Sequence, residues 1–181
     1  MRCTKEFVEL NKSLHERSGF DCGEAELNTF IRQQALRHMS ANVSRTMVLP
    51  ALEATQKKNK EKQNICAFYT VTPSSISREH LPKAQAKKLP HYPIPVFLLA
   101  QLAVDKKHQG TGLGKITLVK ALEHLYKINV HMRAYAVVVD CLNADAESFY
   151  KQFGFEVLFV GDNGRARLFL SMKQLETLFA P

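Results

Sequence analysis

The chain has 181 residues, 45% of them hydrophobic, so it is long and apolar enough to form one compact domain with a buried core. Its formal net charge of +8 predicts a positive field that attracts phosphate-rich partners, either a nucleic acid or a polyanionic cofactor. The longest apolar stretch, residues 94–104, is too short to span a bilayer. We therefore expect a single domain over residues 1–181 that is soluble, unexported and cytoplasmic.

The four cysteines are widely separated in the sequence. Cys3, Cys22, Cys66 and Cys141 form no CxxC pair, and no histidines stand beside them at the spacing of metal ligands. We expect reduced, mostly buried thiols and no metal site.

The first predicted element is a helix over about residues 24–40. Asp21 and Glu24 have the spacing of a capping box, and Leu27, Phe30 and Ile31 then recur on one face at helical spacing. Short apolar runs at 46–52 and 65–71 are typical of strands, whereas residues 56–64 between them contain no apolar residue and predict an exposed loop.

The second half of the chain alternates between strand and helix patterns. We expect a short helix within 77–89, a buried strand at 96–104, a glycine-rich turn and a helix that ends near residue 129. A strand at 133–140, a helix at 144–153 and strands at 155–159 and 167–170 follow. This order predicts a mixed α/β sheet whose parallel or splayed part lies around Leu98 and Ala136.

The glycine-rich turn at residues 109–115 joins a predicted strand directly to a helix. Such a turn presents backbone N–H groups at the positive end of the helix, which suits a pyrophosphate. A Walker A loop requires glycine where Gln109 stands and serine or threonine where Ile116 stands. A dinucleotide fingerprint requires a third glycine where Lys115 stands, so the spacing excludes both motifs.

The same turn resembles the Gln/Arg-x-x-Gly-x-Gly/Ala motif of the GNAT acetyltransferase superfamily, with Gln109, Gly112 and Gly114 at its fixed positions. The strand phrase before it, residues 102–105, reads Leu-Ala-Val-Asp. A second segment, residues 143–155, is similar to that superfamily's Asn-x-x-Ala-x-x-x-Tyr-x-x-x-Gly-Phe motif at every fixed position. The resemblance covers about residues 65–170 and implies a single GNAT domain with its cofactor-binding core at about 96–160.

The resemblance implies that acetyl-CoA is the acetyl donor. The pantetheine arm would pair with backbone groups of the strand and hydrogen-bond Asn143, while the turn would hold the pyrophosphate. The implied cofactor-binding residues are Leu102, Ala103, Val104, Gln109, Gly110, Thr111, Gly112, Leu113, Gly114, Lys115 and Asn143.

Tyr150 would face the thioester sulfur, and we expect it to be the general acid. A thiol pKa near ~8.5 lies below the tyrosine value near ~10, so donation of the phenol proton to the leaving thiolate is only mildly uphill. The alternative is an aromatic ring that only packs under the cofactor. His108, Glu147 and Asp140 are considered as bases, but each is also typical of a loop or surface group, and no base is assigned. Ser148 and Cys141 have no evident base partner, so covalent catalysis is not favoured.

The amino-terminal half resembles the GNAT toxins of bacterial toxin–antitoxin modules, which acetylate the α-amine of aminoacyl-tRNA and so inhibit translation. This likeness rests on residues 20–23 (Phe-Asp-Cys-Gly), 27–31 and 44–46. It implies a homodimer and a ribbon-helix-helix antitoxin, through which the complex binds operator DNA. The alternatives are a GNAT enzyme that acetylates a small amine or a protein amino terminus, and a non-catalytic GNAT that binds acyl-CoA or nucleic acid.

Candidates for RNA binding are the basic residues outside the cofactor motifs. Arg32 and Arg37 lie five residues apart, hence about 140° apart around a regular helix, so they would flank a groove and not share one narrow stripe. Arg45 begins the next predicted strand. The lysine-rich insert at 57–62 and Gln101, where a basic residue is common, depart from the toxin pattern. The insert would add to the positive field or be only a solvated loop.

Overall fold

The computed structural model describes residues 2–52 and 62–179, which divide into two compact units. The first unit contains the described residues up to Thr72 together with Gln101–Ala121. The second contains Pro73–Ala100 and the residues from Leu122 onward. Strands β5 (Gln63–Ile76) and β6 (Ile94–Val104) and helix α4 (Leu113–His131) each run from one unit into the other.

The strands of the first unit are mainly antiparallel. Strand β1 (Arg2–Cys3) pairs with β4 (Arg45–Leu52), and β4 pairs with β5. Two further short strands lie on this framework: β2 (Val8–Glu9) pairs with β4, and β3 (His15–Glu16) pairs in parallel with β5. The apolar runs predicted at 46–52 and 65–71 are confirmed as strands that pair with each other, and buried side chains follow one another along most of both.

One continuous helical segment follows these short amino-terminal strands, and it is not a regular α-helix. It consists of α1 (Ala25–Thr29), a π-helical turn η1 (Phe30–Gln34) and α2 (Ala35–Ser40). The N–H of Ala35 donates to the carbonyl of Phe30, five residues earlier, which is the hydrogen bond of a π turn. The segment packs its apolar face through Phe30, whose ring lies against the fully buried Phe68 of β5.

The predicted extent of this helix is confirmed, but the predicted capping box is wrong. Glu24 is the N-cap residue and makes no side-chain capping bond. The carboxylate of Asp21 instead accepts hydrogen bonds from the N–H of Gly23 and the side-chain amide of Asn28. It also accepts a hydrogen bond from Lys106, a residue far along the chain, and the helix begins three residues beyond the position that the capping box required.

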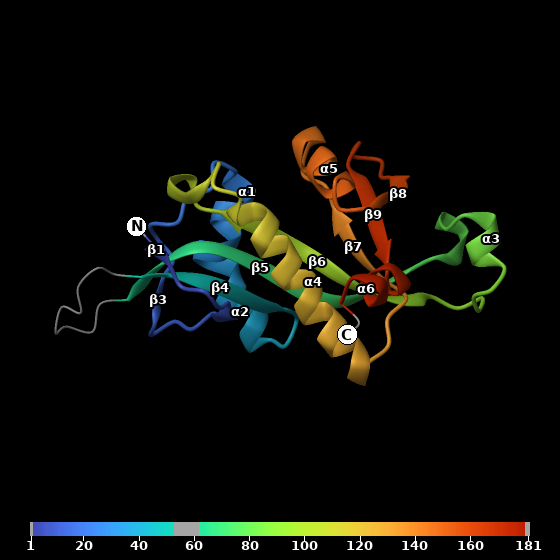
Figure 1. Ribbon diagram of the computed structural model, residues 1–181, viewed down its shortest axis with the longest axis horizontal. Helices are drawn as coiled ribbons and strands as arrows, with labels where there is room; N and C mark the ends of the chain where they lie inside the picture. Colours follow the sequence, from blue (N-terminus) through green and yellow to red (C-terminus); the bar gives the residue numbers. More distant parts are fainter. Residues whose placement is uncertain (1, 53–61, 180–181) are drawn as a thin grey trace. The chain divides into compact units, whose positions relative to one another are not determined.

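The second unit is built on four strands in the order β6, β7, β9, β8, and Figure 1 shows β9 between β7 and β8. Strand β7 (Ala136–Asp140) runs parallel to β6, with Phe97 opposite Val137 and Leu98 opposite Val138. Strands β8 (Glu156–Val160) and β9 (Ala166–Ser171) add antiparallel pairs. The prediction of a mixed α/β sheet with its parallel part at Leu98 and Ala136 is confirmed.

The helices of the second unit differ in part from the prediction. Residues 77–89 form only a 3₁₀ turn, η2 (Arg78–His80), and a short helix, α3 (Lys83–Ala86), because Pro82 stands between them as the N-cap of α3. Helix α5 (Ala144–Lys151) is confirmed, whereas α6 (Met172–Phe179) was not predicted. Among the described residues, no helix has both the length and the apolar character that a membrane span requires.

Candidate active site

The turn after β6 has the backbone geometry that an anion-binding site requires. Asp105 caps the 3₁₀ turn η3 (Lys106–His108) by accepting a hydrogen bond from Lys107 N–H at 3.0 Å. Gly110 and Gly112 follow with φ angles of 74° and 83°, a left-handed conformation that side chains other than glycine rarely adopt. Helix α4 then begins at Leu113 and runs for 19 residues, so its positive end lies at this turn.

Gln109 holds the turn in place through its side chain. Its Nε2 atom donates to the carbonyl oxygen of Cys22 at 2.8 Å and to that of Val104 at 2.9 Å. Both amide hydrogens are therefore engaged, and the side chain has no donor left for a phosphate. Thr111 Oγ1 likewise donates to the carbonyl of His108 at 2.7 Å. In contrast, the exposed ammonium of Lys115 has no partner within the described part of the chain.

The Phe20–Gly23 segment also holds the turn in place through contacts with Asp105 and Lys106. Asp21 N–H donates to the Asp105 carboxylate at 3.0 Å, and Lys106 N–H donates to the Asp21 carbonyl at 2.8 Å. The side chains of Asp21 and Lys106 form an ion pair at 3.0 Å. Lys106, followed by hydrogen bonds from Gly23 and Asn28, lowers the pKa of Asp21 to about 2, so this carboxylate is charged at neutral pH.

Asn143 and Tyr150 lie at the two ends of α5 in the second unit. Asn143 Oδ1 accepts a hydrogen bond from Ala146 N–H at 2.9 Å and so caps the helix. Tyr150 is buried, and its ring contacts those of Phe149 and Phe155. Burial, with a smaller effect of Cys141, raises the pKa of Tyr150, so its phenol stays protonated at neutral pH.

The Tyr150 hydroxyl makes no hydrogen bond to another described residue, although it belongs to a buried side chain. Its proton is therefore not committed to another group of the described protein. The raised pKa also makes this proton harder to transfer than that of a free tyrosine. A thiolate, with a thiol pKa near ~8.5, is a weaker base than the phenolate, so the proton has to move together with departure of the thiolate.

Each residue considered as a base has a structural partner instead. Two hydrogen bonds, of 2.6 and 2.7 Å, join the Asp140 carboxylate to the guanidinium of Arg167. Glu147 pairs with Lys151 at 2.6 Å, one helical turn away. His108 lies 3.6 Å from the Cys3 sulfur. All three side chains therefore have contacts within the described chain, and none is assigned as the base.

Cys141 is unsuited to covalent catalysis. It is buried, and burial, followed by the charges of Glu147 and Asp140, raises the pKa of its thiol to about 11. The nucleophilic thiolate is therefore scarce at neutral pH.

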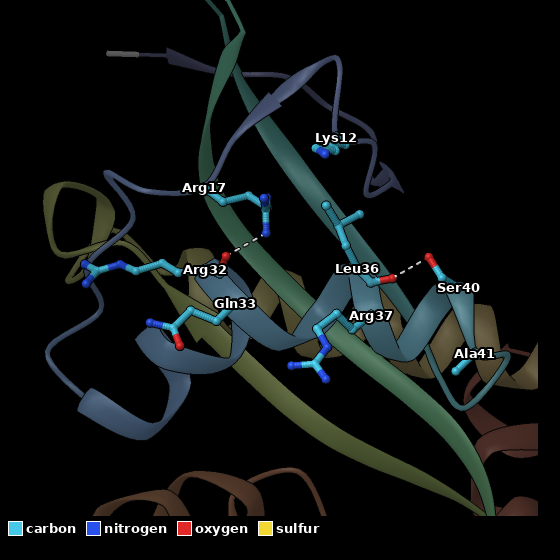
Figure 2. Close-up of a pocket in the computed structure, with 8 residues that line it drawn as sticks. All are labelled: Lys12, Arg17, Arg32, Gln33, Leu36, Arg37, Ser40 and Ala41. Carbon is cyan, nitrogen blue, oxygen red and sulfur yellow. Dashed lines mark hydrogen bonds between the residues drawn. The ribbon is translucent and has the colours of Figure 1, made fainter.

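A basic groove runs along the helical segment of the first unit (Figure 2), with a volume of about 610 Å³. None of the described residues that line it is acidic. The lining residues are Lys12, Arg17, Arg32, Gln33, Leu36, Arg37, Ser40 and Ala41.

The groove brings together two of the three arginines considered for RNA binding. Arg32 and Arg37 both line it, and the angle of about 140° calculated for a regular helix does not apply across the π turn between them. Arg45 is not part of the groove and pairs with Glu9 at 3.4 Å. Lys12 and Arg17 were not predicted, since neither lies in a motif or on the predicted helix. Lys57, Lys58 and Lys60 lie outside the described residues, and Lys62 is exposed.

The four cations of the groove differ in how they are held. Arg17 Nη1 donates to the carbonyl of Arg32 at 2.6 Å, and the Arg32 guanidinium donates to the carbonyl of Phe20. Backbone carbonyls carry no formal charge, so both arginines remain able to attract anions. Lys12 and Arg37 have exposed side chains without a partner among the described residues. The groove therefore suits a phosphate-rich ligand.

Comparisons with known proteins agree with these features. A family model described as acetyltransferase (GNAT) domain matches residues 56–157. The chain is 30% identical over 140 residues to a tRNA-acetylating toxin of Mycobacterium tuberculosis, which covers 77% of this chain and 78% of that protein. A tyrosine-to-phenylalanine mutant of KacT has a similar structure, with 28% identity, a TM-score of 0.85 and coverage of 99% and 100% of the two chains.

Solved structures of other similar chains contain ligands. AtaT complexed with acetyl-methionyl-tRNAfMet is 28% identical, with a TM-score of 0.83 and coverage of 97% and 99%. The AtaTR complex bound with acetyl-CoA is 29% identical, with a TM-score of 0.80 and coverage of 97% and 98%. The family match spans more than half of the chain and includes both motifs up to Phe155. This chain therefore belongs to the GNAT acetyltransferase family.

Proposed function

We propose that this chain is a toxin that transfers the acetyl group of acetyl-CoA to the α-amine of aminoacyl-tRNA and thereby blocks translation. The RNA part of the proposal rests on the basic groove, in which four cations and, among the described residues, no acidic side chain line one volume of about 610 Å³. The same substrate class is supported by the M. tuberculosis relative, which is a tRNA-acetylating toxin, and by AtaT, which has been solved with acetyl-methionyl-tRNAfMet.

The cofactor-binding residues follow from the turn geometry and the family motifs. We propose that backbone groups of residues 102–104 pair with the pantetheine arm, and that residues 109–115 bind the pyrophosphate through backbone N–H groups and Lys115. Gln109 contributes by holding the turn, because its amide hydrogens are already bonded to Cys22 and Val104. Asn143 would contact the arm while its Oδ1 caps α5.

The chemistry then needs one proton donor from the protein. A neutral α-amine attacks the thioester carbonyl, and the tetrahedral intermediate expels the thiolate of coenzyme A. Tyr150 donates its proton to that sulfur. An α-amine has a pKa near ~7.7–8.0, so a useful neutral fraction exists at neutral pH without a dedicated base. This agrees with the structural partners of Asp140, Glu147 and His108.

The partners of related toxins suggest how this activity is controlled. AtaT has been solved bound to the C-terminus of the antitoxin AtaR, and KacTA has been solved with DNA. We propose that this chain forms a cytoplasmic homodimer that a ribbon-helix-helix antitoxin inhibits, and that operator DNA is bound through the antitoxin complex.

The turn is tested by replacing Gly112 with aspartate. The change adds a negative charge where the pyrophosphate would approach, so acetyl-CoA affinity should fall at least tenfold, measured by calorimetry. Gly164→Asp is the matched control, because Gly164 has a similar positive φ of 74° and an added Cβ would meet no atom within 4 Å at either glycine, yet Gly164 lies outside the turn. If Gly112→Asp folds and binds acetyl-CoA as tightly as Gly164→Asp does, the turn does not hold the pyrophosphate.

Tyr150→Phe removes only the phenol hydroxyl and retains the ring that packs against Phe149 and Phe155. Single-turnover acetyl transfer should slow by roughly 10²–10⁴-fold while acetyl-CoA affinity is kept, which is the range for general acid catalysis. Tyr135→Phe is the control for the loss of a tyrosine hydroxyl elsewhere in the unit, because the Tyr135 hydroxyl donates a hydrogen bond to Gln85 at 2.7 Å. A loss of less than about tenfold would reassign Tyr150 to packing.

Arg37→Glu tests the groove. Charge reversal should raise the apparent KM for aminoacyl-tRNA and lower the salt dependence of RNA binding by about one unit of log K per log salt, since a phosphate contact is lost. Acetyl-CoA affinity should be unchanged. Lys173→Glu makes the same charge change at an exposed lysine of α6, outside the groove. Equal effects of the two substitutions on RNA binding would show that only net charge matters.

A further inference from the structure

Two thiols and an imidazole meet in the first unit although they are far apart in the sequence. Cys3 lies on β1, Cys66 on β5, and His108 ends η3. Their two sulfur atoms and a ring nitrogen of His108 all lie within 4.8 Å of one another. Cys66 and His108 are buried, whereas Cys3 is only partly buried.

The distance between one sulfur and the imidazole of this cluster matches that of two ligands around a tetrahedral zinc ion. Zn–S distances of about 2.3 Å and Zn–N distances of about 2.0–2.1 Å place a sulfur and a nitrogen ligand about 3.6 Å apart. The Sγ atom of Cys3 and the Nδ1 atom of His108 are 3.6 Å apart. A thiol–imidazole hydrogen bond also accounts for this one distance, so the second thiol, within 4.8 Å of both atoms, is what distinguishes the cluster.

Backbone hydrogen bonds fix the three elements that carry these side chains. The β1–β4 ladder pairs Cys3 with Ala51, and Thr4 N–H donates to the Pro50 carbonyl at 2.8 Å. Asp105 N–H donates to the carbonyl of Cys66 at 2.9 Å, which joins β5 to the segment that contains His108. Ligands held on ordered elements need little rearrangement to bind an ion.

The charge balance favours a soft divalent cation. A divalent ion that binds both sulfurs releases the two thiol protons to solvent. Two thiolates and a neutral imidazole then leave the buried centre with no net charge. Calcium and magnesium prefer oxygen ligands, whereas zinc accepts two sulfurs and a nitrogen.

We propose that Cys3, Cys66 and His108 bind one Zn²⁺ ion, with water as the fourth ligand. The His108 carbonyl accepts the hydrogen bond of Thr111, and Gln109 follows directly in the chain. An ion bound to His108 would therefore fix the start of the turn at residues 109–115. This consequence for the turn rests on the proposed function, whereas binding of the ion does not.

Cobalt titration tests the site, because Co²⁺ occupies zinc sites and thiolate ligation gives it a charge-transfer absorption. The reduced, chelator-treated chain without a histidine tag should show this absorption, saturate at one Co²⁺ per chain and lose the band when Zn²⁺ is added. Cys3→Ser and His108→Gln should each weaken Co²⁺ binding at least tenfold. Cys22→Ser, a thiol of the same unit outside the cluster, should not.

Zinc should also raise the melting temperature of the wild-type chain and of Cys22→Ser, but not that of Cys3→Ser, because an ion that binds only the folded state stabilises it. A wild-type chain without the thiolate band, or a Cys3→Ser variant that keeps it, would overturn the proposal. The proposal would also be overturned if Cys3 and Cys66 were found as a disulfide and the chain bound no metal after that disulfide had been reduced to two thiols. Neither measurement uses tRNA or acetyl-CoA, so failure here leaves the proposed acetyl transfer untouched.

Discussion

Two hydrogen bonds from the side-chain amide of Gln109, to the carbonyls of Cys22 and Val104, join three parts of the first unit. They connect the turn after β6 to the end of that strand and to the amino-terminal segment Phe20–Gly23. The ion pair of Asp21 with Lys106 strengthens the same junction. Because these groups hold the turn from outside, its glycines stay in the left-handed conformation with backbone N–H groups available at the start of α4.

These contacts also give the amino-terminal segment Phe20–Gly23 a structural role. Phe20 packs its ring against Phe68, the next residue fixes the turn through its carboxylate, and Arg32 donates to the Phe20 carbonyl. The same short segment therefore touches the apolar core, the candidate pyrophosphate turn and one wall of the basic groove. The segment at residues 20–23, which resembles the toxins in sequence, therefore connects the candidate pyrophosphate turn to the basic groove within the first unit.

The features predicted from the sequence were those set by local pattern. Apolar runs sufficed for β4, β6 and β7. The capping box assigned to Asp21 is wrong because the helix begins at Ala25 with Glu24 as its N-cap residue. A real capping box was overlooked at the start of α6, where Ser171 and Gln174 exchange hydrogen bonds. The groove and the Cys3–Cys66–His108 cluster depend on a π turn and on strand pairing, and spacing along the chain reveals neither.

The central claim is that the acceptor is the α-amine of aminoacyl-tRNA, and the most direct measurement is acetyl transfer from labelled acetyl-CoA. The purified chain is incubated with total charged tRNA, with the same tRNA after deacylation, and with free amines and peptides in parallel. The account predicts label on the amino acid of charged tRNA, no label on deacylated tRNA and little on free amines. Label on peptides or small amines but not on aminoacyl-tRNA would contradict it and would leave a GNAT enzyme with a different acceptor.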